Sequence, residues 1–301
     1  MERARVEGHR KKSSSNCSCR GNVAALASCH VSWDAPPEVL ALGSDEVHVW
    51  RAGLNQKASL VQGLLMILSA DEKVRAERFS FQRDREHFIV ARGMLRAILG
   101  RYLQREPTNI RFCYSPKGKP VLAQGLGGDA LRFNLSHSHG LALCAVTNGR
   151  EIGIDLEQVR PDLKVEEIAR RFFSSDEVAT LRTLPPQMQS EAFFACWTRK
   201  EAYIKAKGEG LSFPLHEFDV SLAPGEPAAL LTTREGPQES SRWTLQELMP
   251  GPGYAAALAV EGNGWRLARW EWSAERIMYG VTEHLNTNWQ EHPLRQIQQN
   301  S

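Results

Sequence analysis

The stretch Ile152-Gly-Ile-Asp-Leu-Glu157 sets the predicted fold of this 301-residue chain. Its apolar residues alternate with Gly153, Asp155 and Glu157, and this period of two is typical of a β-strand. Both carboxylates therefore project from the same face of the strand. A hard divalent cation such as Mg²⁺ takes oxygen ligands of this kind, commonly a few carboxylates completed by substrate phosphates and water.

The run Trp197-Thr-Arg-Lys-Glu-Ala-Tyr-Ile-Lys205 provides groups that would face this strand. Trp197, Glu201 and Lys205 are four residues apart and share one face of a helix. Glu201 could complete a magnesium site with three carboxylates, and Lys205 could pair with a phosphate as a point charge. Each motif also has an ordinary interpretation. An Asp-x-Glu at a strand end is usually a solvated edge, and a Lys-Glu helical run is usually a surface with an i,i+4 ion pair.

Together the two motifs resemble the signature pair of the 4′-phosphopantetheinyl transferases, in particular of the larger, surfactin-synthetase-activating (Sfp-like) type. Three further stretches are similar to elements of that family and occur in the same order along the chain. They are the hairpin Lys117-Gly-Lys-Pro120, the element Phe133-Asn-Leu-Ser-His-Ser138, and Pro252-Gly-Tyr254 before an apolar strand. The resemblance covers roughly residues 45–272.

The resemblance implies an enzyme, a phosphopantetheinyl transferase of the holo-[acyl-carrier-protein] synthase type. Such an enzyme transfers 4′-phosphopantetheine from coenzyme A to a serine of an apo acyl or peptidyl carrier protein and releases 3′,5′-ADP. Dependence on Mg²⁺, for which Mn²⁺ can substitute, is implied as well. The expected partners are therefore coenzyme A and a carrier protein, and the expected state is a monomer.

The resemblance also implies roles for the residues of the two motifs. Asp155, Glu157 and Glu201 would bind the metal, and loss of Asp155 would leave pyrophosphate charge unneutralised. Glu201 would also be the catalytic base, either directly or through a water molecule on the ion. Lys205 would hold a pyrophosphate oxygen or assist departure of the leaving group.

A second set of residues would bind coenzyme A itself. Its members carry hydroxyl, imidazole or cationic groups, and they are Arg75, Lys117, Lys119, Ser136, His137 and Lys205. Ser136 and His137 are expected in a tight turn at residues 136–140, where side chains and backbone N–H groups can donate to phosphate. Glu72 stands where some relatives carry lysine, so the clamp on the 3′-phosphate departs from the family pattern.

The sequence predicts an α+β fold built as a pseudo-twofold pair of similar subdomains with the ligand cleft between them. Ser69-Ala-Asp-Glu72 and Ser174-Ser-Asp-Glu177, 105 residues apart, have the pattern of helix N-caps with acidic first turns, each before a long helix. The predicted divisions are an extension at 1–44, a first half at 45–150, a second half with the metal ligands at 151–272, and a polar tail at 273–301.

Composition excludes several classes of protein. The net charge is +2, and residues 1–22 hold six basic against two acidic groups, so the remainder is slightly acidic and nucleic acid is not an expected partner. The longest apolar runs, such as Leu64–Leu68, are too short to span a bilayer, and no membrane partner is expected. The spacing of the six cysteines and the lack of an apolar signal region indicate a reducing, cytoplasmic setting.

Other functions stay open at this point. A magnesium-dependent phosphohydrolase or nucleotidyl transferase could use the three carboxylates, although it would not explain Asn134-Leu-Ser-His137. A non-catalytic coenzyme A-binding or carrier-protein interaction module would retain binding groups without the chemistry. The basic N-terminus could bind nucleic acid as an accessory property. The sequence names no carrier protein, and Arg92, Arg96 and Lys200 have no assigned role.

Overall fold

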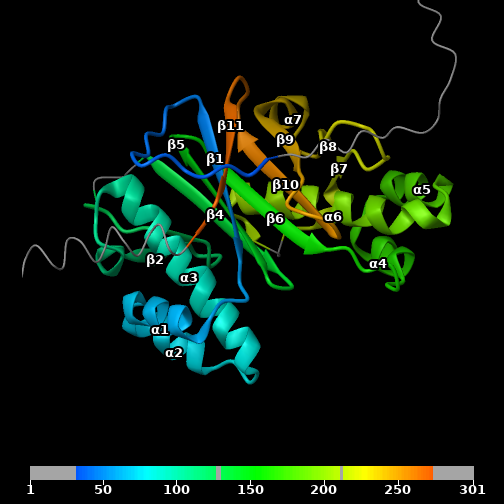
Figure 1. Ribbon diagram of the computed structural model, residues 1–301. Helices are drawn as coiled ribbons and strands as arrows, with labels where there is room; N and C mark the ends of the chain where they lie inside the picture. The colour runs from blue at the N-terminus through cyan, green and yellow to red at the C-terminus, as the bar shows by residue number, and fades with distance from the viewer. Residues whose placement is uncertain (1–31, 127–129, 211–212, 274–301) are drawn as a thin grey trace, which may run out of the picture. The chain divides into compact units, whose positions relative to one another are not determined.

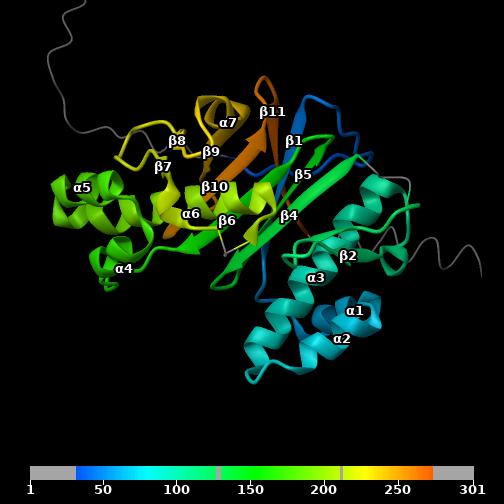
Figure 2. The same ribbon diagram turned by 180° about the vertical axis from the view of Figure 1, so that it is seen from behind.

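The computed structural model describes residues 32–126, 130–210 and 213–273 of the chain (Figures 1 and 2). Most of the predicted N-terminal extension and nearly all of the predicted polar tail lie outside these ranges, so both stay predictions. The described part is a mixed α+β structure, which confirms the predicted class. Within these ranges, none of the helices combines the length and the apolar character that crossing a bilayer requires.

Strands and helices of the first half are β1 Glu46–Gly53, α1 Ala58–Ile67, α2 Ala70–Glu77, α3 Gln82–Leu103, β2 Phe112–Tyr114, β3 Pro120–Leu122, β4 Leu131–Ser138 and β5 Leu141–Asn148. Those that follow are β6 Ile152–Gln158, α4 Val165–Phe172, α5 Ser175–Thr183, α6 Pro186–Lys207, β7 Phe218–Val220, β8 Leu230–Thr233, α7 Pro237–Arg242, β9 Trp243–Leu248, β10 Tyr254–Glu261 and β11 Arg266–Glu271.

The strands form two main sheets with related connectivity. The first sheet has the order β11-β1-β5-β4, and the second has the order β6-β10-β9. Each half runs from a strand through three helices and a short hairpin to two more strands, with the additional helix α7 before β9 in the second half, and β6-β10-β9 repeats the order β1-β5-β4. Strand β11 departs from this plan, because it pairs in parallel with β1. The range 151–272 therefore supplies one strand to the sheet of the first half.

The turn predicted at residues 136–140 is wrong in its first part. Strand β4 continues through Ser138, with Ser136 opposite Leu143 and His137 opposite Ala142 in the antiparallel pairing with β5. The turn itself consists of His139 and Gly140, whose φ values of 44° and 89° suit a two-residue hairpin. Ser136 and His137 therefore offer side chains from a strand and not the backbone N–H groups of a loop.

The two predicted helix caps are present as capping boxes. In α2, Ser69 and Glu72 cap each other's backbone, and Ser174 and Glu177 do the same in α5. Both glutamates are also buried. Since polar groups are costly to bury alone, each needs a cationic partner inside the protein.

Buried cations from the long helices α3 and α6 supply these partners. Arg92 and Arg96 both donate to Glu72, at 2.6 Å for the closest nitrogen of each. Lys200 lies 2.8 Å from Glu177. The three cations without an assigned role are therefore structural, and Glu72 faces the interior and not a ligand.

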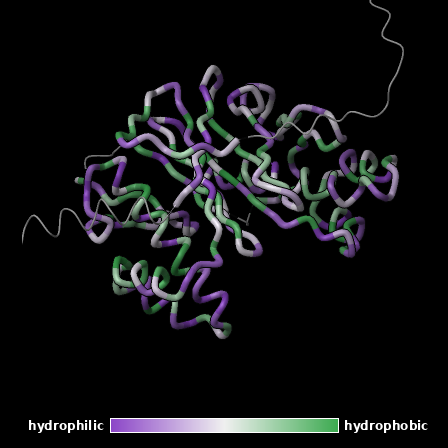
Figure 3. Tube along the Cα trace, viewed as in Figure 1, coloured by the Kyte–Doolittle hydropathy of each residue, from purple (hydrophilic) through white to green (hydrophobic). Residues whose placement is uncertain are grey.

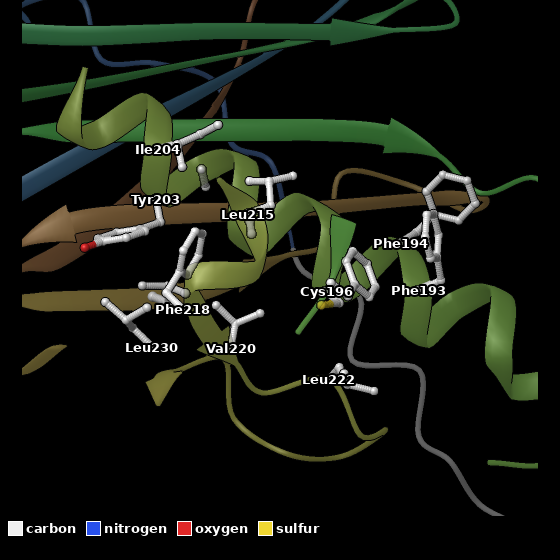
Figure 4. Packing of buried hydrophobic residues seen from close by; sticks show 14 of the residues in the cluster. Phe193, Phe194, Cys196, Tyr203, Ile204, Leu215, Phe218, Val220, Leu222 and Leu230 are labelled. Carbon is white, nitrogen blue, oxygen red and sulfur yellow. The ribbon is translucent and has the colours of Figure 1, made fainter. Parts of the chain in front are cut away.

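Helix α6 is surrounded by the apolar core of the second half (Figure 4). Hydrophilic and hydrophobic residues both occur along the helices (Figure 3). Where α6 crosses β6, Gly153 permits a very close approach. A Cβ atom at this position would lie 2.0 Å from the carbonyl oxygen of Ala202 and 2.4 Å from the backbone nitrogen of Ala206. This glycine therefore brings the functional face of α6 against β6.

Candidate active site

The candidate site lies where strand β4 of the first sheet runs beside strand β6 of the second (Figures 1 and 2). Side chains of β4 join the two strands. The side-chain oxygen of Asn134 accepts a hydrogen bond from the backbone N–H of Ile154 at 2.9 Å, with both groups buried. Asn134 therefore provides a hydrogen-bond acceptor for a backbone N–H group at the edge of β6, and this bond fixes the position of β6 relative to β4.

Two serines continue this row of contacts. Ser136 Oγ donates to Asp155 Oδ1 at 3.0 Å, and Ser138 Oγ donates to Glu157 Oε2 at 3.1 Å. Asn134, Ser136 and Ser138 are two residues apart, so they share the face of β4 that lies toward β6. Asn134 and Ser138 are not among the predicted site residues. Their period of two within the Phe133–Ser138 element is the signal that could have revealed them.

Lys205 completes the centre of this cluster from helix α6. Its Nζ lies 2.5 Å from Asp155 Oδ1, 3.2 Å from Ser136 Oγ and 3.4 Å from the carbonyl oxygen of Ile154. The second carboxylate oxygen of Asp155, Oδ2, is buried and has no hydrogen-bond partner. A buried carboxylate oxygen without a partner is costly unless a cation or donor reaches it.

Glu157 and Glu201, the other two predicted metal ligands, also lack enough nearby positive charge to balance their ionised carboxylates. Burial, together with the charges of Asp155 and Glu157, raises the pKa of Glu201 to about 7 against the influence of Lys205. Burial and the charge of Asp155 likewise raise the pKa of Glu157. The three carboxylates therefore destabilise one another in their ionised forms.

This donor set fits a divalent cation by its chemistry. It consists of hard oxygen ligands, one of which is the partnerless Oδ2 of Asp155. In the described ranges, no group of three or more His, Cys, Asp or Glu side chains is already arranged to hold a metal ion. Lys205 is the cation that lies against Asp155 in this structure.

His137 lies on the opposite face of β4 from the two serines, as the alternation of the strand requires. Its side chain is exposed. The surrounding protein nevertheless desolvates the imidazole, and this effect together with the positive charges of Lys205 and His87 lowers its pKa. The imidazole therefore lies near the positive charge of Lys205, and an anion beside it would favour its protonated form.

Lys119 contacts the first residue of β6, before the carboxylates. Its Nζ is 3.2 Å from the carbonyl oxygen of Ile152 and 3.3 Å from that of Ala206, close to the C-terminal end of α6. Glu151 is 3.6 Å away. Burial lowers the pKa of Lys119, and Glu151 opposes that shift. Lys119 and Lys205 therefore bind alternate carbonyl groups, those of Ile152 and Ile154, along one edge of β6.

Lys119 also lines a cavity of about 800 Å³. The walls combine apolar side chains from β3 and β4 with cationic groups and the C-terminal end of α6. They include Leu122, Leu131, Phe133, Arg132, Lys207 and Gly208. Apolar and polar groups both line this cavity, and its volume is in the range of small-molecule sites.

The two remaining predicted coenzyme A residues are exposed on the first half. Arg75, on α2, lies with its guanidinium 5.5 Å from the ring centre of Phe88 and lines a second cavity of about 700 Å³. Lys117 is at the turn of the β2–β3 hairpin beside Gly118. The structure thus places Asp155, Lys205 and Ser136 in direct contact, whereas Arg75 and Lys117 occupy surface positions on α2 and the β2–β3 hairpin.

Comparison with known proteins gives two family matches that cover most of the described residues. Residues 151–259 match the 4′-phosphopantetheinyl transferase superfamily, and residues 53–148 match the family described as "4′-phosphopantetheinyl transferase, N-terminal". The 4′-phosphopantetheinyl transferase HetI of Nostoc sp. is 46% identical over 241 residues, which are 80% of this chain and 98% of that protein.

More distant relatives are also named as transferases. The 4′-phosphopantetheinyl transferase psf-1 of Bacillus pumilus is 35% identical over 66% of this chain and 82% of its own length. The 4′-phosphopantetheinyl transferase Sfp of Bacillus subtilis is 31% identical over 65% of this chain and 83% of its own length. Among solved structures, holo-[acyl-carrier-protein] synthase of Thermotoga maritima is 19% identical with a TM-score of 0.28, over 38% of this chain and 63% of that chain.

Proposed function

This chain belongs to the 4′-phosphopantetheinyl transferase superfamily, in its Sfp-like type, and we propose that the seam between β4 and β6 is its active site. It is a transferase that moves the phosphopantetheine group to carrier proteins. Coenzyme A is the donor, a serine of an apo acyl or peptidyl carrier protein is the acceptor, and 3′,5′-ADP is the second product. The observation that carries the location is the contact of Lys205 with Asp155 and Ser136 beside two carboxylates of raised pKa.

The reaction forms a bond between the acceptor serine oxygen and the β-phosphorus of coenzyme A. The bond from that phosphorus to the bridging oxygen breaks, and its electron pair leaves on 3′,5′-ADP. The serine proton must pass to a base, and Glu201 suits this role because its pKa of about 7 allows it to accept a proton near neutral pH. Lys205 holds an oxygen of the pyrophosphate and stabilises the leaving phosphate.

Asp155, Glu157 and Glu201 would hold Mg²⁺ in this proposal, and Mn²⁺ would substitute for it. Support comes from the buried Oδ2 of Asp155 and from the raised pKa values of the two glutamates. When bound, such an ion neutralises pyrophosphate charge. Ser138 keeps Glu157 directed toward the cluster through its hydrogen bond.

The remaining parts of coenzyme A would be bound by groups along β4 and the β2–β3 hairpin. The cavity beside Lys119 has the size and lining for the adenosine portion. His137 would bind the 3′-phosphate, and an anion there would raise the lowered pKa of its imidazole. Arg75 and Lys117 would add positive charge from the surface.

We also propose that the two halves are a pseudo-twofold pair and that the ligand lies between them. The shared order of elements and the matching sheet orders support this arrangement. Because one chain then supplies both walls of the site, a monomer would be active. A reducing, cytoplasmic setting belongs to the same proposal, and three free cysteines among the described residues support it.

The deciding experiment incubates the protein with coenzyme A, Mg²⁺ and a small panel of apo carrier proteins, followed by intact mass measurement. The expected result is a carrier heavier by one phosphopantetheine group, with an equal amount of 3′,5′-ADP. Binding of coenzyme A without any mass change would favour the non-catalytic interaction module. Release of phosphate without carrier modification would favour a phosphohydrolase.

A further inference from the structure

Lys205 forms an ion pair with Asp155, one of the proposed metal ligands, in addition to its proposed contact with a substrate phosphate. In this structure its ammonium group lies 2.5 Å from Asp155 Oδ1, and Ser136 Oγ reaches the same oxygen at 3.0 Å. Asp155 Oδ2 stays buried without a partner. Lys205 therefore already supplies the positive charge that a divalent cation would bring to Asp155.

A divalent cation bound at Oδ2 would approach this ammonium group closely. The two positive charges would then share one carboxylate in a partly buried place, where Coulomb repulsion is poorly screened. The nearby carboxylates of Glu157 and Glu201, which interact electrostatically with Lys205, would themselves hold the cation. The other hydrogen-bond acceptors of Lys205 in the described structure, Ser136 Oγ and the carbonyl oxygen of Ile154, are neutral. Neither group replaces the charge of a carboxylate.

The diphosphate of coenzyme A would resolve this conflict. A phosphate oxygen can accept the ammonium group in a charge-assisted hydrogen bond as strong as the one it leaves. Asp155 would then be free to interact fully with the cation. Metal and diphosphate would thus help each other to bind, and thermodynamic linkage makes this coupling equal in both directions.

We propose that Lys205 acts as an exchangeable counter-ion, so that the protein binds a divalent cation weakly by itself and takes the cation together with the diphosphate of coenzyme A. This inference rests on the proposed metal role of Asp155, Glu157 and Glu201. It assigns Lys205 a function in the free protein, where its positive charge occupies the carboxylate until a phosphate displaces it.

The test measures Mn²⁺ affinity directly, by calorimetry and by the electron paramagnetic resonance signal of free Mn²⁺, with and without coenzyme A. Lys205→Met removes the competing charge, and we expect it to bind Mn²⁺ alone at least about tenfold more tightly than the unaltered protein. Coenzyme A should raise the Mn²⁺ affinity of the unaltered protein about 5- to 150-fold, the usual range for coupled sites. In Lys205→Met this coupling should be clearly smaller, because only the direct attraction between cation and diphosphate remains.

Two further variants serve as controls. Lys205→Arg keeps the positive charge and should retain weak binding of free Mn²⁺. Lys164→Met removes an exposed lysine that pairs with Glu167 on α4 and should leave Mn²⁺ affinity unchanged. Circular dichroism and thermal melting establish that each variant is folded.

The outcomes separate this inference from the function it rests on. If Lys205→Met binds Mn²⁺ without coenzyme A no more tightly than the unaltered protein does, the counter-ion role alone is overturned. Failure of both proteins to bind Mn²⁺ even with saturating coenzyme A overturns the metal assignment itself, and the counter-ion role with it. Transfer to the carrier protein is measured separately and does not enter either comparison.

Discussion

Lys200 Nζ lies 2.8 Å from Glu177 Oε1, and both side chains are buried in the core of the second half. The same ammonium group donates to the carbonyl oxygens of Leu215, at 2.8 Å, and Phe218, at 2.5 Å. One residue therefore joins helix α6 to the capping box of α5 and to the segment leading into β7. Because Glu201 is the next residue on α6, this buried pair fixes the helix that carries the candidate base.

Removing one partner of this pair should destabilise the protein strongly. Lys200→Met leaves Glu177 buried without its counter-charge, and we expect a loss of about 3–5 kcal/mol in the free energy of unfolding measured with urea. The double variant Lys200→Met/Glu177→Gln removes both charges and should lose less than the sum of the two single variants. Strict additivity of the two losses would contradict a direct interaction.

Gly153 should tolerate no side chain, because its Cβ would meet the backbone of α6 at 2.0 Å. Gly153→Ala should shift α6 away from β6, so that Glu201 and Lys205 move relative to Asp155. We expect a loss of roughly 1–3 kcal/mol in stability, as for overpacked cores, together with loss of most transfer activity. Gly53→Ala is the matched control, because a methyl group at that position would meet no atom within 4 Å. Equal behaviour of the two variants would refute the close approach of α6.

Transfer should require a divalent cation held by Asp155. Removal of metal with a chelator should abolish turnover, and added Mg²⁺ or Mn²⁺ should restore it. Asp155→Asn keeps the shape of the side chain but loses its charge, and we expect activity to fall by roughly a hundredfold or more. The exposed carboxylate Asp162 provides a control, and Asp162→Asn should stay close to full activity. Full turnover after exhaustive chelation would rule out the metal requirement.

His137→Ala should chiefly raise KM for coenzyme A, because its proposed contact with the 3′-phosphate is remote from the reacting phosphorus. A charge-assisted contact contributes about 1.5–3 kcal/mol, so a loss of roughly ten- to a hundredfold is expected. Steady-state kinetics should also be measured with 3′-dephospho-coenzyme A. If the variant is impaired to the same degree with that substrate, His137 does not recognise the 3′-phosphate.

In the metal-free protein, the stabilising contribution of Glu201 should be lost as the pH rises from about 5 to about 8. Glu201 has a folded pKa of about 7 against an ordinary value of 4.5, so between these values the folded state binds more protons than the unfolded chain. Stability is therefore lost as Glu201 ionises, by an amount on the order of 3 kcal/mol. Urea unfolding of the unaltered protein and of Glu201→Gln, both in chelator, should show that the unaltered protein loses stability relative to the variant as the pH rises. An identical pH dependence of the two proteins would exclude Glu201 as the source.

Much of the local structure can be predicted from the sequence. Strand β6, the two capping boxes and the long helix α6 are predictable because a period of two, a Ser-x-x-Glu pattern and a period near four report interactions between residues close along the chain. The motif Phe133–Ser138 is also visible in the sequence, although the predicted strand ends too early. Even the three metal-ligand candidates can be named from residue type and spacing.

Only the tertiary structure decided how these pieces meet. The parallel return of β11 to β1, the contacts of Asn134 and Ser138 with β6, and the burial of Lys200 against Glu177 all join residues from separate elements. Such contacts depend on which edges and faces the chain brings together, and no local period records them. The sequence by itself determined which chemical groups this protein has and which local elements carry them. The packing of α6 on β6, with β4 beside that strand, decided that Lys205 meets Asp155, because a side-chain contact between distant elements exists only once the core has fixed their separation.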